Sequence, residues 1–203
     1  MSVLNVLQLP PVPWRNGQGQ TREIETFPSG AGFDNFVWRI SLADIEQAGD
    51  FSAFDGVDRI ITLVKGSGVN LNFNDGERQT LEYGIPYPFA GERSLHATLQ
   101  NGPVQDLNLM LRRGQAAGRI QAESAASAWP CAPGTTYRVF CLKGAWQLLV
   151  ERADATTDTI TLSTFDYVPL PDQATHVRAS PTQPDGLILV ACIQASQPPS
   201  GTA

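Results

Sequence analysis

Short segments in which hydrophobic and polar residues alternate follow one another along most of the chain. In the segment 36–45, large apolar side chains occupy every second position, and Arg39, Ser41 and Ala43 share the opposite face. A period of two is that of a β-strand, whose successive side chains point to opposite sides. Arg39 and Ser41 therefore project together, and a cavity on their side would place donors for an anion or an amide about one pleat repeat apart. The alternation does not say which face is buried.

The same alternation predicts further strands separated by turn residues. We expect strands at 3–9, 21–27 and 106–112, and a pair of strands interrupted by the turn Lys65–Gly68. Prolines directly after the first of these segments would end that strand. The polar connection 43–59 is long for a loop, and long loops tend to be functional or packed by their own side chains.

Two of the predicted strands carry several polar residues on one face. In the strand 21–27, a period of two places Arg22, Ile24 and Thr26 together. In the strand 106–112, Asp106 and Asn108 alternate with leucines, which gives this strand one largely polar and one apolar face.

The second half of the chain resembles a diverged copy of the first. The segment LVKGSG at 63–68 has a counterpart in CLKGAW at 141–146. Further pairs lie at a constant separation of 81 positions, namely Thr80 and Thr161, Pro88 and Pro169, Pro103 and Pro184, and Leu107 and Ile188. A fixed separation at several places indicates an internal repeat of one structural unit. Its short strands, early glycine turn and later proline corner resemble the double-stranded β-helix of cupins, in which closure protects strand edges.

The repeat predicts an all-β chain with two cupin-like barrels, a bicupin of the RmlC-like type. Residues 113–135 are rich in Ala, Ser and Gly and are the best candidate for a boundary. We expect an N-terminal barrel over 1–115 and a C-terminal barrel over 116–203 that ends in a frayed tail from residue 196. Because the first copy has more polar strand positions, we expect it to hold a ligand pocket and the second copy to be structural.

The composition limits the classes of partner. Of the 203 residues 42% are hydrophobic and 17% charged, with 18 Gly and 15 Pro, which is typical of an ordered, turn-rich chain. A formal net charge of -6 argues against nucleic acid, whose binders normally carry a basic surface. We find no secretion signal and no apolar run of the ~20 residues that a membrane span needs. With only Cys131, Cys141 and Cys192, we expect free thiols and a cytoplasmic protein that does not bind membranes.

The histidines are too few for the metal site that many cupins carry. His96 and His176 fall in different copies of the repeat, and asparagines at 70, 72 and 74 stand where paired metal-binding histidines would fall. No motif of nucleophilic catalysis or phosphate binding is present. We therefore expect no metal and no cofactor, and interpret His96 as a packed or hydrogen-bonded side chain more readily than as a base.

The segment WRNGQGQTRE at 14–23 departs furthest from what a plain β-domain needs. It combines an indole, two arginines, three amides and two glycines, and no aliphatic side chain. Gly17 and Gly19 permit positive φ or a close approach of the backbone, and Arg15 and Arg22 offer planar forks of donors. One interpretation is a loop that runs into a strand and lines a small-molecule pocket. The other is a glycine-rich surface turn with solvated arginines.

These segments together resemble one family. WRNGQGQTREI, FVWRISLADIEQAGDFSAFDGVDRIITLVKGSG, PFAGE and GPVQDLNLMLRRG are similar to the ordered motifs of the HutD/Ves family of small bacterial bicupins, closely over residues 10–115. The matching motif positions are Trp14, Asn16, Thr21, Arg22, Glu23, Trp38, Arg39, Ser41, Asp58, Arg59, Asp106 and Asn108. All of these except Asp106 are our candidate ligand-binding residues. The middle glycine of the family's opening motif is Gln18 here, and a side chain at this position could narrow the pocket or contact the ligand.

The resemblance implies a cytoplasmic protein linked to histidine utilisation, for which the family as a whole has no established enzymatic activity. Our leading hypothesis is a non-enzymatic bicupin that senses or buffers a small carboxylate such as urocanate, formylglutamate or formate, held by Arg22, Arg39 or Arg59. A second hypothesis is a metal-independent isomerase or hydrolase with Glu23 or His96 as general base. A third is a scaffold protein with a vestigial pocket. The oligomeric state is left open by the sequence.

Overall fold

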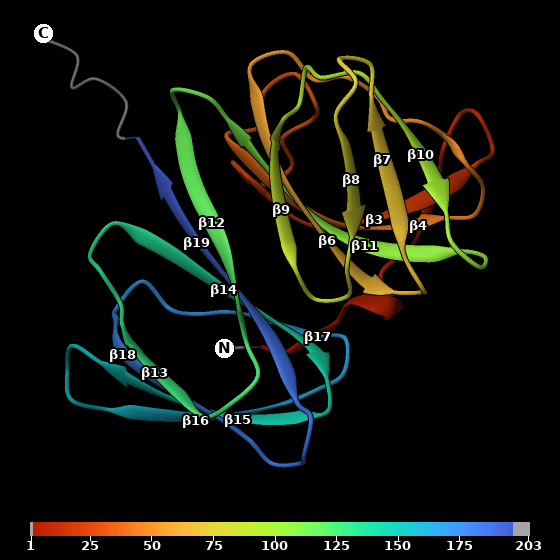
Figure 1. Ribbon diagram of the computed structural model, residues 1–203. Helices are drawn as coiled ribbons and strands as arrows, with labels where there is room; N and C mark the ends of the chain where they lie inside the picture. Colours follow the sequence, from red (N-terminus) through yellow and green to blue (C-terminus); the bar gives the residue numbers. More distant parts are fainter. Residues whose placement is uncertain (1, 197–203) are drawn as a thin grey trace, which may run out of the picture. The chain divides into compact units, whose positions relative to one another are not determined.

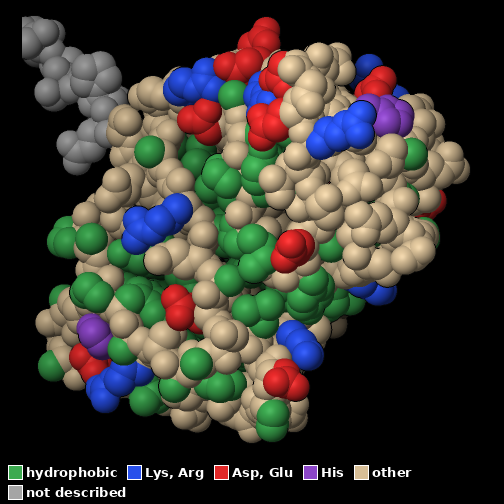
Figure 2. All heavy atoms as spheres, in the orientation of Figure 1, with side chains coloured by type: hydrophobic (Ala, Val, Ile, Leu, Met, Phe, Trp, Pro, Cys, Tyr) green, Lys and Arg blue, Asp and Glu red, His purple; other side chains and the backbone are tan. Residues whose placement is uncertain are grey.

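The computed structural model describes residues 2–196, whose regular secondary structure is almost entirely antiparallel β-sheet (Figure 1). Two compact units can be separated. The N-terminal unit contains Leu9–Ala117, and the C-terminal unit consists of Gly118–Ala195 together with the residues up to Gln8. None of the described residues forms a helix of the length and hydrophobicity that a membrane crossing requires. On the face drawn in Figure 2, basic side chains lie singly or beside acidic ones.

The N-terminal unit is built from a six-stranded and a four-stranded sheet. The larger sheet has the order β2-β3-β4-β11-β6-β9, with strands Val12–Pro13, Gly19–Phe27, Trp38–Ile45, Val104–Arg112, Val57–Lys65 and Pro86–Ala90. The smaller sheet has the order β5-β10-β7-β8, with strands Gly49–Asp50, Leu95–Leu99, Val69–Phe73 and Arg78–Leu81. The predicted strands at 21–27, 36–45 and 106–112 are confirmed to within two residues at their ends.

The C-terminal unit repeats this strand order. Its larger sheet, β1-β17-β14-β19-β12, consists of Leu4–Asn5, Asp166–Pro169, Thr135–Lys143, Leu187–Ala195 and Ala116–Glu123. Its smaller sheet, β13-β18-β15-β16, consists of Ser127–Pro130, Ala174–Pro181, Ala145–Arg152 and Thr157–Ser163. The order β12-β19-β14-β17 corresponds to β4-β11-β6-β9, and β13-β18-β15-β16 to β5-β10-β7-β8. The internal repeat inferred from the constant sequence separation is therefore confirmed.

The beginning of the chain differs from the prediction. Only Leu4–Asn5 of the expected strand 3–9 is a strand, and it pairs with β17 in the C-terminal unit, whereas we had placed it in an N-terminal barrel over 1–115. Val6–Gln8 form a 3₁₀-helix. The side chain of Asn5 explains the change, since its Oδ1 accepts a hydrogen bond from the backbone N–H of Leu7 at 3.2 Å, as in an Asx-turn. The predicted frayed tail lies, beyond Ser196, outside the described residues.

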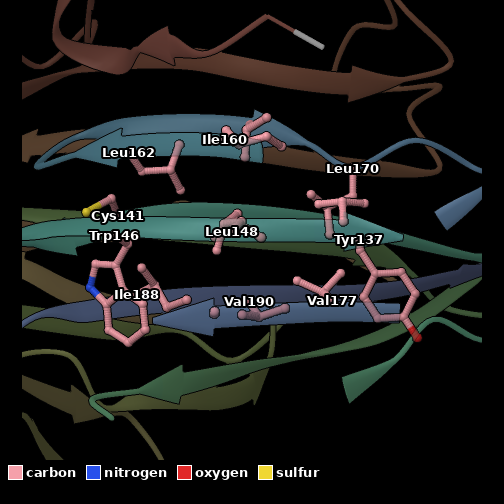
Figure 3. Close-up of a cluster of buried hydrophobic side chains, with 14 of the residues drawn as sticks. Tyr137, Cys141, Trp146, Leu148, Ile160, Leu162, Leu170, Val177, Ile188 and Val190 are labelled. Atoms are coloured by element: carbon pink, nitrogen blue, oxygen red, sulfur yellow. The ribbon is translucent and has the colours of Figure 1, made fainter. Parts of the chain in front are cut away.

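The core of the C-terminal unit is a continuous cluster of apolar side chains contributed by both of its sheets (Figure 3). Trp146, Leu148 and Val150 alternate along β15 and are all fully buried. Gly186 leaves room for the indole, because a Cβ atom there would lie 2.7 Å from Trp146 Nε1. These side chains occupy the interior of the unit, where a ligand would need space. The packing supports the structural role that we expect of the second copy.

The N-terminal unit has a comparable apolar core at only part of its interior. Val69, Leu71 and Phe73 of β7 point into it and are buried. Asn70 and Asn72 consequently point outward, where Asn70 Oδ1 accepts a hydrogen bond from Thr80 Oγ1 at 2.8 Å. The side chains of β7 that face the interior, at the position of the metal-binding pair of other cupins, are therefore apolar.

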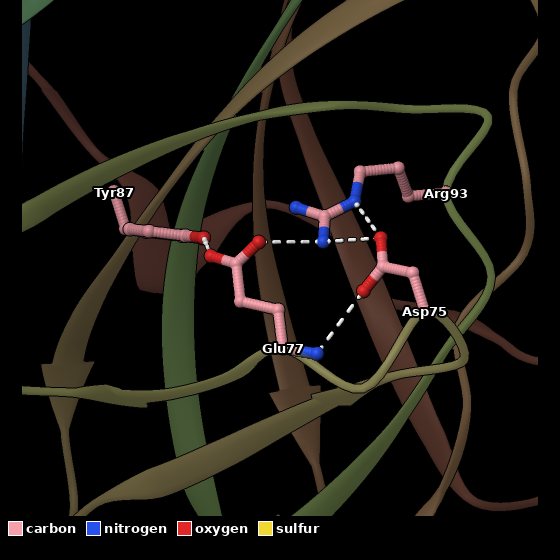
Figure 4. Close-up of polar contacts among 4 residues, drawn as sticks. All are labelled: Asp75, Glu77, Tyr87 and Arg93. Carbon is pink, nitrogen blue, oxygen red and sulfur yellow. Dashed lines mark hydrogen bonds and ion pairs between the residues drawn. The ribbon is translucent and has the colours of Figure 1, made fainter.

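An ion-pair network closes one edge of this core (Figure 4). The guanidinium group of Arg93 contacts the carboxylates of Asp75 and Glu77, each at 2.6 Å, and Glu77 also accepts a hydrogen bond from the Tyr87 hydroxyl at 2.8 Å. Arg93 stacks over the ring of Phe73, 3.8 Å from its centroid. The network therefore fixes the aromatic side of the core.

We expect this network to make stability sensitive to acid. The backbone N–H of Glu77 and the guanidinium of Arg93 lower the pKa of Asp75, and the Tyr87 hydroxyl and Arg93 lower that of Glu77. A carboxyl group whose pKa is lowered in the folded state stabilises the fold at pH values above the ordinary carboxyl range. This stabilisation is lost as the pH falls through the lowered pKa. In urea denaturation between about pH 6 and 3, Arg93→Met should show a smaller loss of stability on acidification than the wild type. The exposed Arg78→Met is the control, and equal slopes for all three proteins would contradict the role.

Candidate functional site

The N-terminal unit contains a cavity of about 670 Å³ next to its apolar core. One wall is the large sheet, and the others are the N-terminal segment around Trp14 and the loop that includes Phe51 and Phe54. The volume lies within the roughly 300–1,000 Å³ usual for small-molecule sites. All of the lining residues belong to Leu9–Ala117.

The register of the large sheet brings the polar strand positions together. Three cross-strand rows follow from the pairing, namely Thr26, Arg39, Met110, Arg59 and Phe89; then Glu23, Ser41, Asn108 and Ile61; then Thr21, Ala43, Asp106 and Leu63. Successive rows are about 7 Å apart, because each is two residues further along the strands. The faces predicted for 36–45 and 106–112 are confirmed, and the side of Arg39 and Ser41 is the cavity side.

A β-bulge in β3 overturns the face predicted for 21–27. The register shifts between Glu23 and Glu25, so that Glu23 lies opposite Ser41 whereas Thr26 lies opposite Arg39. Even-numbered residues before the extra residue consequently point to the opposite face of the sheet from even-numbered residues after it. Arg22, which we expected on the same face as Thr26, points away from the cavity.

Arg22 forms a separate polar cluster on the far side of the sheet. Its guanidinium lies 2.6 Å from the carboxylate of Asp44, which also accepts hydrogen bonds from Gln20 and Gln105. Burial alone would raise the pKa of Asp44, but the hydrogen bonds from Arg22, Gln105 and Gln20 outweigh it and lower the pKa. Arg22 is thus neutralised by a partner and is not among the residues that line the cavity.

Two other candidate residues also lie outside the cavity. Trp38 is buried on the face of β4 opposite Arg39 and stacks on Phe27 with a centroid distance of 5.9 Å. Asp58 is exposed in part and lies 2.7 Å from Arg113. The remaining candidates line the cavity, namely Trp14, Asn16, Thr21, Glu23, Arg39, Ser41, Arg59 and Asn108. Binding of a ligand by these residues stays a prediction.

Arg59 has an unusual environment for a charged side chain. It is 6% exposed, and its guanidinium carbon lies over the rings of Phe51, Phe54 and Phe89 at 5.4, 5.6 and 5.1 Å from their centroids. Its Nε has no acceptor in the described part of the chain, and no ion pair among residues 2–196 includes it. Burial lowers the pKa of Arg59 to about 10, so it remains a cation at neutral pH.

One of the aromatic residues around Arg59, Phe89, is held by the network of Figure 4. Phe73, beneath Arg93, packs edge-on against Phe89 with a centroid distance of 5.7 Å, and Phe89 lies under Arg59. The ring beneath Arg59 is thereby fixed, although no residue within 2–196 accepts a hydrogen bond from Arg59 Nε.

Arg39 is, in contrast, fully engaged. Its Nε donates to Glu23 at 3.0 Å and its NH1 to Ser41 Oγ at 2.9 Å, and it lies over the ring of Phe33 at 4.9 Å. Arg39 therefore orients Ser41 and balances the charge of Glu23, which leaves Arg59 as the buried arginine of the wall that is available to an anion.

Asp106 and Asn108 form a buried polar pair on β11. They are 2% and 7% exposed, and both line the cavity. Burial raises the pKa of Asp106 to about 7, although the positive charge of Arg59 acts in the opposite direction. Asn108 Oδ1 receives no hydrogen bond from any described residue.

The raised pKa of Asp106 predicts a specific pH dependence of stability. The folded-state pKa of Asp106 lies above the ordinary value of 3.8. The contribution of the protonated carboxyl to the stability of the folded state is therefore complete below about pH 4 and is lost as pH rises to about 7. Asp106→Asn should remove this loss, so that the variant gains stability over the wild type between these values. Urea denaturation at several pH values measures it, with Asp158→Asn in the C-terminal unit as control. A constant difference between Asp106→Asn and wild type across the range would contradict the prediction.

The glycine-rich opening segment is part of the cavity wall. Trp14 Nε1 donates to Thr21 Oγ1 at 2.7 Å, and Asn16 Nδ2 donates to Gln18 Oε1 at 2.8 Å. Gly19 is required for the close approach of the segment to β4, since a Cβ atom there would lie 2.2 Å from the Asp44 carbonyl oxygen. Gln18 itself does not line the cavity and acts on it through Asn16.

With this geometry established, comparison with known proteins identifies the family. The HutD family model matches residues 8–186. The chain belongs to the HutD family. It is 38% identical over 150 residues to protein Ves of Citrobacter koseri, covering 73% of this chain and 76% of that protein. An uncharacterised 21.2 kDa protein in the hutC 3′ region of Pseudomonas putida is 38% identical over 121 residues, 60% of this chain and 63% of that one. The HutD/Ves family is thereby linked to the histidine-utilisation region.

Solved structures place the HutD family fold among the cupins. A conserved protein of unknown function from Pseudomonas aeruginosa PAO1 matches with a TM-score of 0.84 at 26% identity, covering 96% of this chain and 98% of that chain. HutD from Pseudomonas fluorescens SBW25 matches with a TM-score of 0.81 at 25% identity over 97% and 99% of the two chains. A cupin from Leptotrichia buccalis has a TM-score of 0.60 at 12% identity over 96% of each chain, which shows the fold alone.

Several cavity residues of this HutD family member were not among our candidates. They include Asp106, which the family motif contains, and the aromatic residues Phe33, Phe51 and Phe54. The length of the connection 43–59 was the feature of the sequence that could have indicated Phe51 and Phe54. His96 lies on β10 outside the lining and contacts Asp50 at 2.7 Å, in agreement with its interpretation as a hydrogen-bonded residue. Among the residues described, no group of three or more His, Cys, Asp or Glu could hold a metal ion.

Proposed function

We propose that the cavity binds a small carboxylate metabolite of histidine breakdown, and that the protein modulates that pathway in the cytoplasm as a non-enzymatic sensor or buffer. The observation that carries the proposal is Arg59, a buried cation at the cavity wall with no hydrogen-bond acceptor for its Nε and no ion-pair partner among residues 2–196. A buried charge without a partner is costly, and an anion in the cavity would supply one.

The chemistry of the wall supports a carboxylate. The guanidinium fork of Arg59 can donate two parallel hydrogen bonds to the two oxygens of a carboxylate. The phenylalanine rings around it exclude water, which strengthens such a bond. Thr21 and Ser41 add hydroxyl groups, and Asn16 an amide, at the same cavity.

The relatives guide the choice of compounds. The structure of HutD from Pseudomonas fluorescens SBW25 is described as a formate condition, and the relative from Pseudomonas putida is encoded in the hutC 3′ region. Urocanate, formylglutamate, formate and glutamate form a panel of carboxylates that fits both descriptions and differs in size and in the groups beyond the carboxylate.

Thermal shift and calorimetry with this panel test the proposal. Binding at the cavity should raise the melting temperature with increasing ligand concentration and give one site per chain. Chloride at the same ionic strength is the control for non-specific salt effects. No response to any of the four compounds in a folded sample would contradict the proposal and favour the scaffold alternative.

The enzymatic alternative makes a different prediction for the same compounds. Its candidate base His96 lies outside the cavity lining, and its other candidate, Glu23, is ion-paired with Arg39 at 3.0 Å. NMR spectra of each compound after prolonged incubation with the protein should therefore show it unchanged. Turnover that chelators do not affect and that Glu23→Gln abolishes would establish the enzymatic alternative instead.

A further inference from the structure

The cavity contains hydrogen-bond acceptors as well as the Arg59 cation. The Asp106 carboxylate takes part in no ion pair among residues 2–196, and Asn108 Oδ1 has no donor there. Both side chains are more than nine-tenths buried and line the cavity. A carboxylate ligand cannot satisfy the ionised Asp106 carboxylate or Asn108 Oδ1, since it brings only further acceptors.

The positions of these acceptors define a second place in the cavity. Asn108 lies one cross-strand row from Arg59, and Asp106 lies two rows away along the same strand. With rows about 7 Å apart, and a long arginine side chain bridging part of this separation, one small molecule can reach both places. Ala43, beside Asp106 in its row, leaves space that a larger side chain would fill.

We propose that Asp106 and Asn108 form a second subsite that accepts hydrogen bonds from an N–H group of the ligand, so that the cavity selects small molecules with both a carboxylate and an N–H donor. The proposal rests on the carboxylate site at Arg59 and specifies what the other end of the ligand must be. Sites with buried acceptors discriminate strongly, because a ligand without the donor leaves the acceptors desolvated and unpaired.

Two pairs of compounds test the selection. N-acetylglycine and 4-oxopentanoate differ only by an N–H in place of a methylene group. Urocanate and trans-3-(2-furyl)acrylate share a planar ring and a carboxylate, and only urocanate has a ring N–H. The two pairs also distinguish an amide close to the carboxylate from an imidazole further away. We expect the N–H member of at least one pair to bind about tenfold more tightly by calorimetry.

Variants assign this preference to the subsite. Asn108→Leu has similar volume but no acceptor, and should reduce the preference to within about twofold while changing the affinity for formate little. Asp106→Ala, which also removes an acceptor, provides a second variant if Asn108→Leu does not fold. Asp158→Asn, in the C-terminal unit, is the matched control and should keep the wild-type preference.

Proton release on ligand binding is a measurement that a purely structural role of Asp106 would not change. An N–H donor favours the charged form of Asp106, so near pH 7 the N–H member of a pair should release more protons on binding than its partner, which brings the same carboxylate. Calorimetry in buffers of different ionisation enthalpy measures this difference, and Asp106→Asn should abolish it. The other charged groups at the cavity are Arg15, Glu23, Arg39, Asp50 and Arg59, and Asp44 also acts on Asp106 through its charge.

The outcomes separate the two proposals. Equal affinity within both pairs would overturn the second subsite and leave the carboxylate site standing. Absence of binding by all four compounds and by formate would overturn both. A preference for the N–H compounds that survives in Asn108→Leu and in Asp106→Ala would place the donor's partner elsewhere and also overturn this inference.

Discussion

Replacement of Arg59 by methionine is expected to weaken carboxylate binding by about 100-fold, because hydrogen bonds to a charged group contribute roughly 1.5–3 kcal/mol and every 1.4 kcal/mol is a factor of ten. Methionine fills a similar volume among the three phenylalanine rings but carries no donor. Calorimetry with the tightest-binding compound of the panel measures the loss.

The stability of the ligand-free Arg59→Met protein should change little. The substitution removes both a desolvated charge and its stacking on aromatic rings, and these effects oppose each other, so we expect a change within about 1 kcal/mol in urea denaturation. Arg113→Met, which removes an exposed arginine paired with Asp58 and Glu92, is the matched control for affinity. Unchanged carboxylate affinity in Arg59→Met would contradict the assignment of Arg59 as the anion-binding group.

Truncation of Trp146 to alanine is expected to destabilise the C-terminal unit by about 3–5 kcal/mol, the usual cost of removing a large aromatic side chain from a core. Trp146 is 0% exposed, and the cluster around it in Figure 3 comes from strands of both sheets. The cavity left behind cannot be filled easily, because the neighbouring side chains are themselves buried and constrained.

Trp129→Ala provides the comparison for Trp146→Ala in the same unit. Trp129 is only partly buried against the same cluster, so its truncation should cost clearly less. Chemical denaturation followed by tryptophan fluorescence measures both, and Leu148→Ala substitutes if Trp146→Ala does not fold. Equal costs for the two tryptophans would show that burial in this core does not determine the loss.

The fold could be predicted largely because the relevant signals are local. Alternation along 36–45 and 106–112 gave the strands and their faces, and the constant separation between the two halves gave the repeated strand order. The beginning of the chain could not be predicted in this way. Leu4 and Asn5 pair with Tyr167 and Asp166, a contact over a sequence distance that no local pattern encodes.

The site was predictable in its residue types but not in its geometry. Arg22, Arg39 and Arg59 are equivalent by composition, and only the sheet register and their neighbours separate them. Arg22 is neutralised by Asp44 and Arg39 by Glu23, whereas Arg59 lies among aromatic rings that come from one loop and one strand. Such partners depend on long-range packing, so the sequence alone left the three open.

The bulge in β3 determines which charge of the opening segment faces the cavity. If Ile24 were paired regularly, with Thr26 still opposite Arg39, then Ile24 would lie opposite Ser41 and Arg22 would lie opposite Ala43. Arg22 would then face the cavity, and Glu23 would turn outward. One unpaired residue in a strand thus keeps a negative charge at the cavity wall in place of a positive one.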